Sequence, residues 1–285
     1  MTAPRQSTIP RTNHNPASEW SIEKLDLDAY LSRLGYAGDL APTAQTLRTL
    51  HRAHLSAIPF ENLDIVLGRS IQLDIDSLQD KLVRSRRGGY CYEHNLLFGA
   101  VLERLGYTVS RLVARVRPDG TGPRTHMLLR VDVDGHAWLA DVGFGGGVLE
   151  PIPLEAATTS QQGGWTYDLH RQDGGTWLLR SIRPDGPANL YSFTLEPHRP
   201  ADYELINYYT STHPNSPFTG RAMAMRVEEE IHYTLVDREL TIRRPEGAVE
   251  QRELAGAELG RVLMDTFGLI LSAQELATLH STSKS

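Results

Sequence analysis

The sequence predicts an α+β protein built from three small lobes. Three observations lead to this prediction. The first third of the chain follows a helical period, the middle third alternates with the period of two that is typical of strands, and the last third mixes both patterns. No internal repeat is visible. We therefore expect helices first, then an antiparallel sheet or small barrel, then a mixed lobe.

Four segments of the first third carry apolar residues at helical spacing. The clearest covers residues 27–34, with Asp26 as a candidate N-cap and Gly35 just past its end. The other three are expected over residues 43–54, 77–86 and 91–105. We expect Gly88-Gly89 to end the third helix and to let the backbone turn sharply into the fourth, which places Cys91 at a helix N-terminus.

The middle of the chain alternates apolar and polar residues in short runs. Strands are expected over residues 110–116, 126–133, 136–142, 165–170 and 176–182. Asp134-Gly135, between the second and third of these runs, is a strong signal for a two-residue type I′ hairpin. The last third predicts a helix over 202–209, a Pro-containing loop over 211–218, strands over 223–227, 232–236 and 240–243, and helices over 256–266 and 273–279.

Composition narrows the function class. The chain has 285 residues, 40% of them hydrophobic, and a formal net charge of −6, which argues against nucleic acid or an anionic membrane surface as a main partner. A single cysteine allows no internal disulfide, and the longest apolar runs are too short to span a membrane. Residues 1–20 are polar and contain proline, so they read as a flexible tail. We expect a cytoplasmic protein.

The one cysteine, Cys91, lies in the stretch "RGGYCYEHN". Free N–H groups and the positive end of the dipole stabilise a thiolate at a helix N-terminus, which favours a nucleophile. A lone cysteine is more often a small buried hydrophobic residue, and that interpretation stays open. Glu93 would repel a thiolate, so we expect it to face a cation such as Arg87.

A nucleophilic thiol needs a base, and the base needs a group that orients it. In a two-residue turn at Asp134-Gly135, Val133 pairs with His136, so Asp141 lies opposite Leu128 and diagonal to His126 on one face. Diagonal neighbours lie about 7–8 Å apart at the backbone, within reach of an imidazole–carboxylate hydrogen bond. A surface His and Asp on a barrel exterior would fit the same register. A metal site using Cys91 and His94 is a weaker alternative, since no second ligand pair completes it.

Residues 87–93, "RGGYCYE", match the R-G-G-x-C-x-E signature of the arylamine N-acetyltransferases. The resemblance continues, in that family's order and spacing, at "IPFENLDI" (58–65), "THMLL" (125–129), "DVGFGGG" (141–147) and "NYYTSTHPNSPF" (207–218). It covers nearly everything from about residue 21 to the C-terminus.

The resemblance implies a helical bundle over residues 21–106 that carries the nucleophile, a β-barrel over 107–205 that carries the His and Asp, an α/β lid over 206–285, and a papain-like Cys-His-Asp core. It further implies that Cys91 accepts the acetyl group, that His126 is the base and that Asp141 orients the imidazole. The reaction would be ping-pong from acetyl-CoA to an aromatic amine, hydrazine or hydroxylamine. Acetyl-CoA would be a co-substrate, with no tightly bound cofactor and no metal.

The same resemblance assigns further contacts. Phe60, Phe144 and Phe218 match positions that line the acceptor pocket, although each would also suit an ordinary core. Candidate contacts to CoA are Gly143, Gly145, Gly146, Thr210, Ser211, Thr212 and His213. A Gly-rich loop also ends a strand well, and an exposed, locally capped turn is the alternative for residues 210–213. Arg87 matches a structural ion-pair residue.

Three other functions remain open from the sequence. An amide synthase of the same fold would close an aromatic-amine macrolactam from a carrier-bound acyl chain. A thiol hydrolase would use the same three groups, since Cys-His-Asp also serves proteases and amidases. A binding protein with an inert, buried thiol would be non-catalytic. The sequence leaves the acceptor amine, the oligomeric state and the ligands of the CoA phosphates undetermined.

Overall fold

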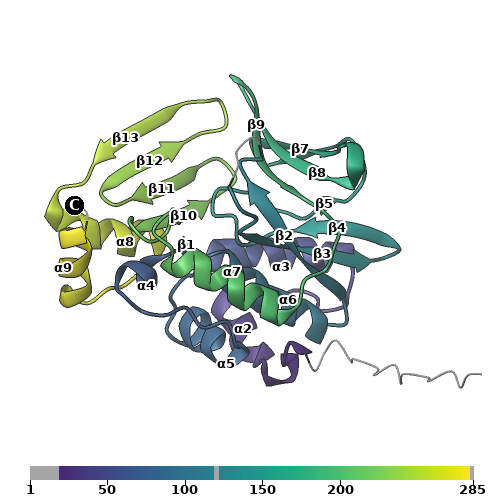
Figure 1. Ribbon diagram of the computed structural model, residues 1–285, viewed down its shortest axis with the longest axis horizontal. Helices are drawn as coiled ribbons and strands as arrows, with labels where there is room; N and C mark the ends of the chain where they lie inside the picture. Colours follow the sequence, from purple (N-terminus) through teal and green to yellow (C-terminus); the bar gives the residue numbers. More distant parts are fainter. Residues whose placement is uncertain (1–18, 119–121, 283–285) are drawn as a thin grey trace, which may run out of the picture.

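The first part of the chain forms a group of helices that lies below both sheets in the view of Figure 1. The structure, a computed structural model, describes residues 19–118 and 122–282, so all of the expected tail except Glu19 and Trp20 lies outside the described residues. The helices of this part are η1 (Ile22–Lys24), α2 (Leu27–Leu34), α3 (Ala44–Ala57), α4 (Leu63–Val66), α5 (Ile75–Leu78), the π-helix η2 (Gln79–Arg84) and α6 (Cys91–Arg104).

Local chemistry sets the ends of the first helices as the sequence predicts. Asp26 caps α2 by accepting a hydrogen bond from the Ala29 N–H at 3.0 Å, and Gly35 ends it with a φ of 64°. Thr43 caps α3 through the Thr46 N–H at 3.1 Å. The predictions over residues 27–34 and 43–54 are therefore confirmed, with α3 running three residues further, to Ala57.

The prediction of a single α-helix over residues 77–86 is wrong. The chain forms one α-helical turn, α5, and then widens into η2, where the Ser85 N–H donates to the Asp80 carbonyl five residues earlier. This helix ends before the two glycines, and Arg86 takes a φ of 51°. Gly88 and Gly89 keep negative φ values and are needed for space, because a Cβ on Gly88 would overlap the Pro59 carbonyl oxygen and one on Gly89 would lie 2.7 Å from Glu93 Oε2.

The central strands form an eight-stranded antiparallel sheet in the order β5-β4-β3-β2-β9-β8-β7-β6, and the end strands β5 and β6 also contact each other. The predicted barrel is therefore confirmed. Its strands are β2 (Thr108–Val116), β3 (His126–Val133), β4 (His136–Ala140), β5 (Ile152–Pro153), β6 (Thr158–Gln162), β7 (Trp165–Arg171), β8 (Trp177–Arg183) and β9 (Gly186–Phe193). The short 3-10 helix η3 (Asp173–Gly175) connects β7 to β8.

The β3–β4 hairpin has the predicted register. Asp134 and Gly135 both have positive φ, 53° and 75°, as a type I′ turn requires, and Val133 pairs with His136. Leu129 pairs with Ala140, so Asp141 follows directly past the end of β4 on the side of His126. The turn chemistry therefore fixes which residues of the two strands meet.

The last part of the chain builds a second antiparallel sheet, in the order β1-β10-β11-β12-β13, at the upper left of Figure 1. Its strands are β1 (Phe60–Glu61), β10 (Met223–Val227), β11 (His232–Val236), β12 (Glu239–Arg243) and β13 (Val249–Glu253). The helices of this part are α7 (Pro200–Thr212), η4 (Gly256–Glu258), α8 (Leu259–Phe267) and α9 (Ala273–Thr282). Because β1 comes from the helical part, this sheet joins the two ends of the chain.

The loop predicted over residues 211–218 begins later than expected, because the helix α7 includes its first two residues. This helix extends three residues beyond the predicted end and includes Thr210, Ser211 and Thr212. It also begins before residue 206, where the sequence placed a lobe boundary. The division at residues 20, 106 and 205 stays a prediction.

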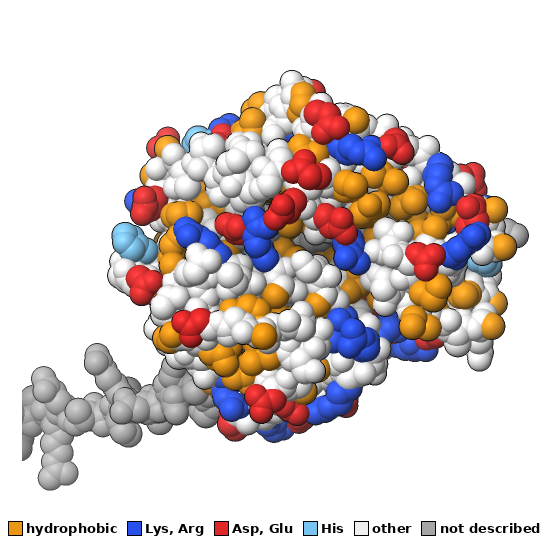
Figure 2. All heavy atoms as spheres, turned by 180° about the vertical axis from the view of Figure 1, so that it is seen from behind, with side chains coloured by type: hydrophobic (Ala, Val, Ile, Leu, Met, Phe, Trp, Pro, Cys, Tyr) orange, Lys and Arg blue, Asp and Glu red, His pale blue; other side chains and the backbone are white. Residues whose placement is uncertain are grey.

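Three buried apolar clusters correspond to the three parts of the molecule. One packs the helices against the face of β2–β4 and includes Cys91, one fills the barrel around Tyr167 and Tyr191, and one lies between the second sheet and α8. On the face seen in Figure 2, acidic and basic side chains are interspersed. Among the helices within the described residues, none is long and apolar enough to cross a membrane.

A chain of buried histidines ties the helices together. The Pro59 carbonyl can only accept, so His94 Nε2, at 3.1 Å, is the donor and His94 Nδ1 accepts from His54 Nε2 at 2.8 Å. His54 Nδ1 then accepts from the Tyr30 hydroxyl at 2.7 Å. A third buried histidine, His51, lies 2.9 Å from the Leu149 carbonyl through Nδ1. The contacts thus assign a neutral tautomer to both His54 and His94.

These histidines should make the fold sensitive to acid. Burial lowers the pKa of both His51 and His94 from 6.5 to about 4, and burial together with the neighbouring His94 lowers that of His54 well below 6.5. The unfolded chain therefore binds these protons first, and stability present above pH 6.5 is lost as pH falls toward 4. His51 and His94 should each contribute about 3 kcal/mol to this loss.

Urea unfolding measured at intervals from pH 7.5 to 4.5 checks this expectation. His94→Gln should flatten the dependence of the unfolding free energy on pH, while His136→Gln, on an exposed histidine, should leave it unchanged. Equal slopes for wild type and His94→Gln would contradict the assignment.

Candidate active site

Cys91 is the first residue of α6, and ion pairs fix the loop that precedes it. The Glu93 carboxylate accepts from the Tyr90 N–H at 3.0 Å and pairs with Lys81 at 2.7 Å. Arg87 instead pairs with the buried Glu61 at 2.8 Å. The expectation that Glu93 faces a cation is therefore confirmed, but that cation is Lys81 and not Arg87. An ion-paired Arg87 is also confirmed. The result is a cysteine, 3% exposed, fixed at a helix N-terminus.

The structure brings His126 and Asp141 together as the hairpin register predicts. His126 Nε2 lies 2.7 Å from Asp141 Oδ2, and both side chains are buried. The Cys91 thiol interacts with the same imidazole and raises its pKa, and its Sγ lies 3.8 Å from the carbonyl oxygen of Thr125, the residue before His126. Because Nε2 contacts the carboxylate, Nδ1 is the nitrogen left for the thiol. The alternative of a solvent-facing pair on the barrel exterior is excluded by this burial.

The electrostatics of the three groups favour a charged imidazole. Burial alone would lower the pKa of His126, but the Asp141 carboxylate and the Cys91 thiol raise it from 6.5 to about 10. Burial alone would raise the pKa of Asp141, yet His126, Asn95 and the Gly143 N–H together lower it. At neutral pH the site therefore holds an imidazolium beside a carboxylate.

Asn95, which the sequence analysis did not single out, connects all three elements of the site. From α6 its Nδ2 donates to the Met127 carbonyl of β3 at 2.7 Å and to Asp141 Oδ1 at 3.0 Å, and its Oδ1 accepts from the Val142 N–H at 3.2 Å. Every hydrogen-bonding atom of this buried amide has a partner. Its position four residues after Cys91, on the same helix face, was the available signal.

His51 contacts the site from α3. Its Nε2 accepts from the Asp141 N–H at 3.2 Å, while its Nδ1 donates to the Leu149 carbonyl at 2.9 Å. The two ends of the segment from Asp141 to Leu149 are thus held by one neutral imidazole. No sequence signal pointed to this residue.

The three predicted pocket phenylalanines fall into two places. The Phe144 ring packs edge-on against His126 at 5.2 Å, next to Tyr191. Phe60 and Phe218 lie 6.1 Å apart at their centroids, with Phe60 stacked on His94 and Phe218 against Tyr90. All three therefore lie against residues of the site or of the segment around Cys91.

The three glycines predicted to contact CoA differ in how much space surrounds them. A Cβ on Gly143 would lie 2.7 Å from the Cys91 Cα, so this position admits only glycine without a shift. Gly145 has a φ of 80° and a Cβ there would meet Met225 and Phe60, whereas the space around Gly146 is open. The segment lies close to Cys91 at Gly143 and leaves room at Gly146.

Residues 210–213 lie at the end of α7. Thr210 is buried, and its hydroxyl is 3.1 Å from that of Tyr92, the neighbour of Cys91. Ser211 and Thr212 donate to carbonyls four residues earlier in the helix, and His213 stacks on Tyr209. Only Thr210 of the four therefore contacts the segment around the cysteine directly.

A metal site at Cys91 and His94 finds no support. Both nitrogens of His94 are engaged, one with His54 and one with Pro59. Throughout the described residues there is no group of three or more His, Cys, Asp or Glu side chains that could hold a metal ion.

Comparison with known proteins assigns the family. The N-acetyltransferase family profile matches residues 43–276. The arylamine N-acetyltransferase / N-hydroxyarylamine O-acetyltransferase of Salmonella typhimurium is 39% identical over 249 residues, which cover 85% of this chain and 88% of that protein.

Solved structures similar to this chain point to the same family. The arylamine N-acetyltransferase of Nocardia farcinica superposes with a TM-score of 0.90 at 43% identity, covering 95% of this chain and 100% of the other. The enzyme of Mycobacterium marinum, solved in complex with CoA, has a TM-score of 0.84 at 38% identity, with 90% and 98% covered. This chain belongs to the arylamine N-acetyltransferase family.

Proposed function

We propose that this protein transfers the acetyl group of acetyl-CoA to an arylamine, arylhydrazine or arylhydroxylamine through an acetyl-Cys91 thioester. The observation that carries the proposal is the single imidazole of His126, which contacts the Asp141 carboxylate and also interacts with the Cys91 thiol. A nucleophile, a base and an orienting group in this order form an acyl-transfer site. The names of the relatives and the CoA-bound relative support the choice of donor and acceptor.

In the first half-reaction the Cys91 thiolate attacks the carbonyl carbon of acetyl-CoA. The carbon–sulfur bond to CoA breaks, the CoA thiolate takes the proton from His126, and CoA leaves as a thiol. In the second half-reaction the amine nitrogen attacks the acetyl carbon, His126 takes a proton from that nitrogen, and the bond to Cys91 breaks. The thiolate and the imidazolium are restored.

Burial of the site suits transfer to an amine over hydrolysis. Cys91 is 3% exposed, and the neighbouring Phe144 ring packs on the imidazole that would activate an attacking water. Aromatic side chains also give an arylamine a surface to stack on. A thioester formed here is therefore shielded from water while it waits for the acceptor.

Intact-protein mass spectrometry tests the thioester. Mixing with acetyl-CoA should add one acetyl group at Cys91, and adding an aromatic amine such as anisidine should remove it. Cys91→Ser should show no gain under the same conditions. A gain only with longer acyl thioesters would replace the acetyl donor with the donor of an amide synthase. Loss of acetyl without amine would indicate a hydrolase.

Asp141→Asn tests whether Asp141 orients the imidazole of His126. An amide at this position would favour the wrong tautomer of His126, and the corresponding change in a serine triad lowers kcat about 10⁴-fold. We expect a loss of that order in the rate of Cys91 acetylation, measured in a single turnover. A loss of only about 10-fold would mean that Asp141 does not orient the imidazole.

Asn95→Ala should lower the acetylation rate by about 100-fold, the size of effect that a misplacement near 1 Å can produce. Asn95→Asp should be worse, since it sets a second carboxylate beside Asp141. Asn215→Ala, on an exposed asparagine, is the control for the substitution itself. An acetylation rate of Asn95→Ala equal to that of the control would rule out the positioning role.

A further inference from the structure

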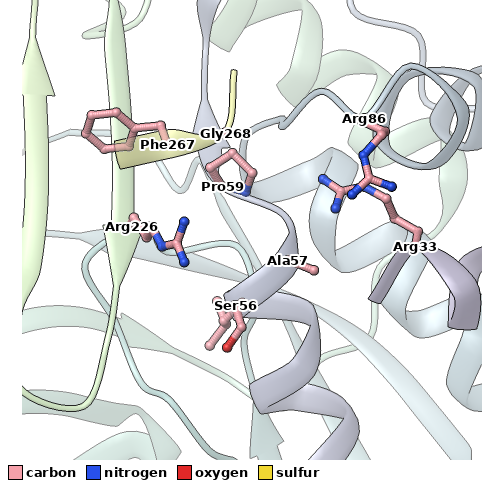
Figure 3. A pocket seen from close by; sticks show the side chains of 9 residues that line it. Arg33, Ser56, Ala57, Pro59, Arg86, Arg226, Phe267 and Gly268 are labelled. Carbon is pink, nitrogen blue, oxygen red and sulfur yellow. The ribbon is translucent and has the colours of Figure 1, made fainter. Parts of the chain in front are cut away.

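A cavity whose lining includes none of Cys91, His126 and Asp141 is lined by three arginines. It has a volume of about 120 Å³ and lies between the last turn of α3 and the end of α8. Arg33, Arg86 and Arg226 line it, together with Ser56, and its lining includes no acidic side chain. Figure 3 shows the Arg33 and Arg86 side chains together on one side and Arg226 facing them from the strand β10. We call this cavity the three-arginine pocket.

Arg33 is buried beside a like charge. This residue is 9% exposed, and its Nε donates to the Leu82 carbonyl at 3.0 Å. Burial, and then the neighbouring Arg86, lower the pKa of Arg33 from 12.5 to about 10. Among the described residues, neither Arg33 nor Arg86 has an acidic partner within ion-pair distance. No acidic side chain among the described residues therefore offsets the repulsion between them.

The surroundings offset only part of the positive charge. Arg226 Nε lies 3.0 Å from the Glu228 carboxylate, and its Nη1 donates to the Thr266 carbonyl at 3.2 Å. The C-terminal ends of α3 and α8 each contribute about half a negative charge. Together these groups offset about two of the three positive charges, so about one remains, next to Arg33 and Arg86.

The backbone at Arg86 adds a second indication. Its φ of 51° lies in the left-handed region, which is strained for a non-glycine residue, and such strain is often found at functional sites. This conformation follows the end of η2 and directs an exposed arginine toward the buried Arg33.

We propose that the three-arginine pocket binds a phosphate group. Guanidinium groups present paired N–H donors that match the oxygens of a phosphate, and the Ser56 hydroxyl offers a further donor. A cavity of about 120 Å³ holds several water molecules, and so has room for one compact anion. The group can belong to free inorganic phosphate or to a phosphate ester such as CoA. The proposal does not depend on the acetyl-transfer mechanism.

Binding of inorganic phosphate to the whole protein tests the pocket. The melting temperature is measured as sodium phosphate replaces sodium chloride at constant ionic strength, and the Kd by calorimetry. Phosphate should raise the melting temperature, and chloride should not. Arg86→Ala should weaken phosphate binding by about 10-fold or more, because each charge-assisted hydrogen bond contributes about 1.5–3 kcal/mol.

Two further variants keep the test decisive. Arg84→Ala removes a nearby exposed arginine that pairs with Asp80, and it should bind phosphate as wild type does. Arg33→Lys keeps the buried charge but loses the paired donors, and it should weaken binding by about 10-fold while still folding. Equal melting temperatures in phosphate and chloride, or equal affinities for Arg86→Ala and Arg84→Ala, would overturn the proposal and leave the arginines as partners of the helix ends only.

A competition experiment then separates the two sources of phosphate. CoA that displaces inorganic phosphate from wild type, with dephospho-CoA failing to do so, supports a site for the 3′-phosphate of CoA. CoA that binds without displacing phosphate supports a site for the free anion. Cys91→Ser should behave as wild type in both measurements, so loss of acetyl transfer and loss of anion binding remain distinguishable.

Discussion

The contact between His126 and Asp141 is the constraint around which the rest of the site is built. Burying a carboxylate costs several kcal/mol unless hydrogen bonds and an opposite charge compensate it. Here one oxygen faces the imidazole, and the other accepts from Asn95 and from the Gly143 N–H. These donors come from a strand, a helix and a loop. The Asp141 carboxylate can be buried only when the strand, the helix and the loop are all in place. The hydrogen bonds that stabilise it therefore form only when the whole site assembles.

A second buried network fixes the segment that carries Cys91. The buried carboxylates of Glu61 and Glu93 face Arg87 and Lys81, and Asp64 pairs with both cations. Glu93 also caps α6, and Gly88 and Gly89 let the loop approach Pro59 and this carboxylate without a clash. Because Pro59 in turn accepts from His94, the histidine chain and the ion pairs support opposite sides of one short segment.

What could be predicted from the sequence was local. The Asp134-Gly135 turn fixes the hairpin register, and the register brings His126 to Asp141 before any tertiary contact is known. The widening of η2 and the strand β9, which has glycine and proline at its start, follow from packing that no short window contains. Asn95 and His51 were missed for the same reason, since their partners lie from 32 to 98 residues away in the chain.

The charges of the site explain how one imidazole can serve both halves of the proposed reaction. Part of the high pKa of His126 comes from Cys91, and the rest of the increase comes from Asp141. Acetylation of the sulfur removes the contribution of Cys91 and therefore lowers the pKa of His126. The imidazolium is most stable before Cys91 attacks, and it becomes a stronger acid as the sulfur bonds to the acetyl carbon, which is when it must give a proton to the departing CoA. Once Cys91 is acetylated, the lower pKa of His126 favours the neutral imidazole, which can accept a proton from the amine. Asp141 keeps the ring in one orientation through both steps, so the change of role requires no movement of the ring.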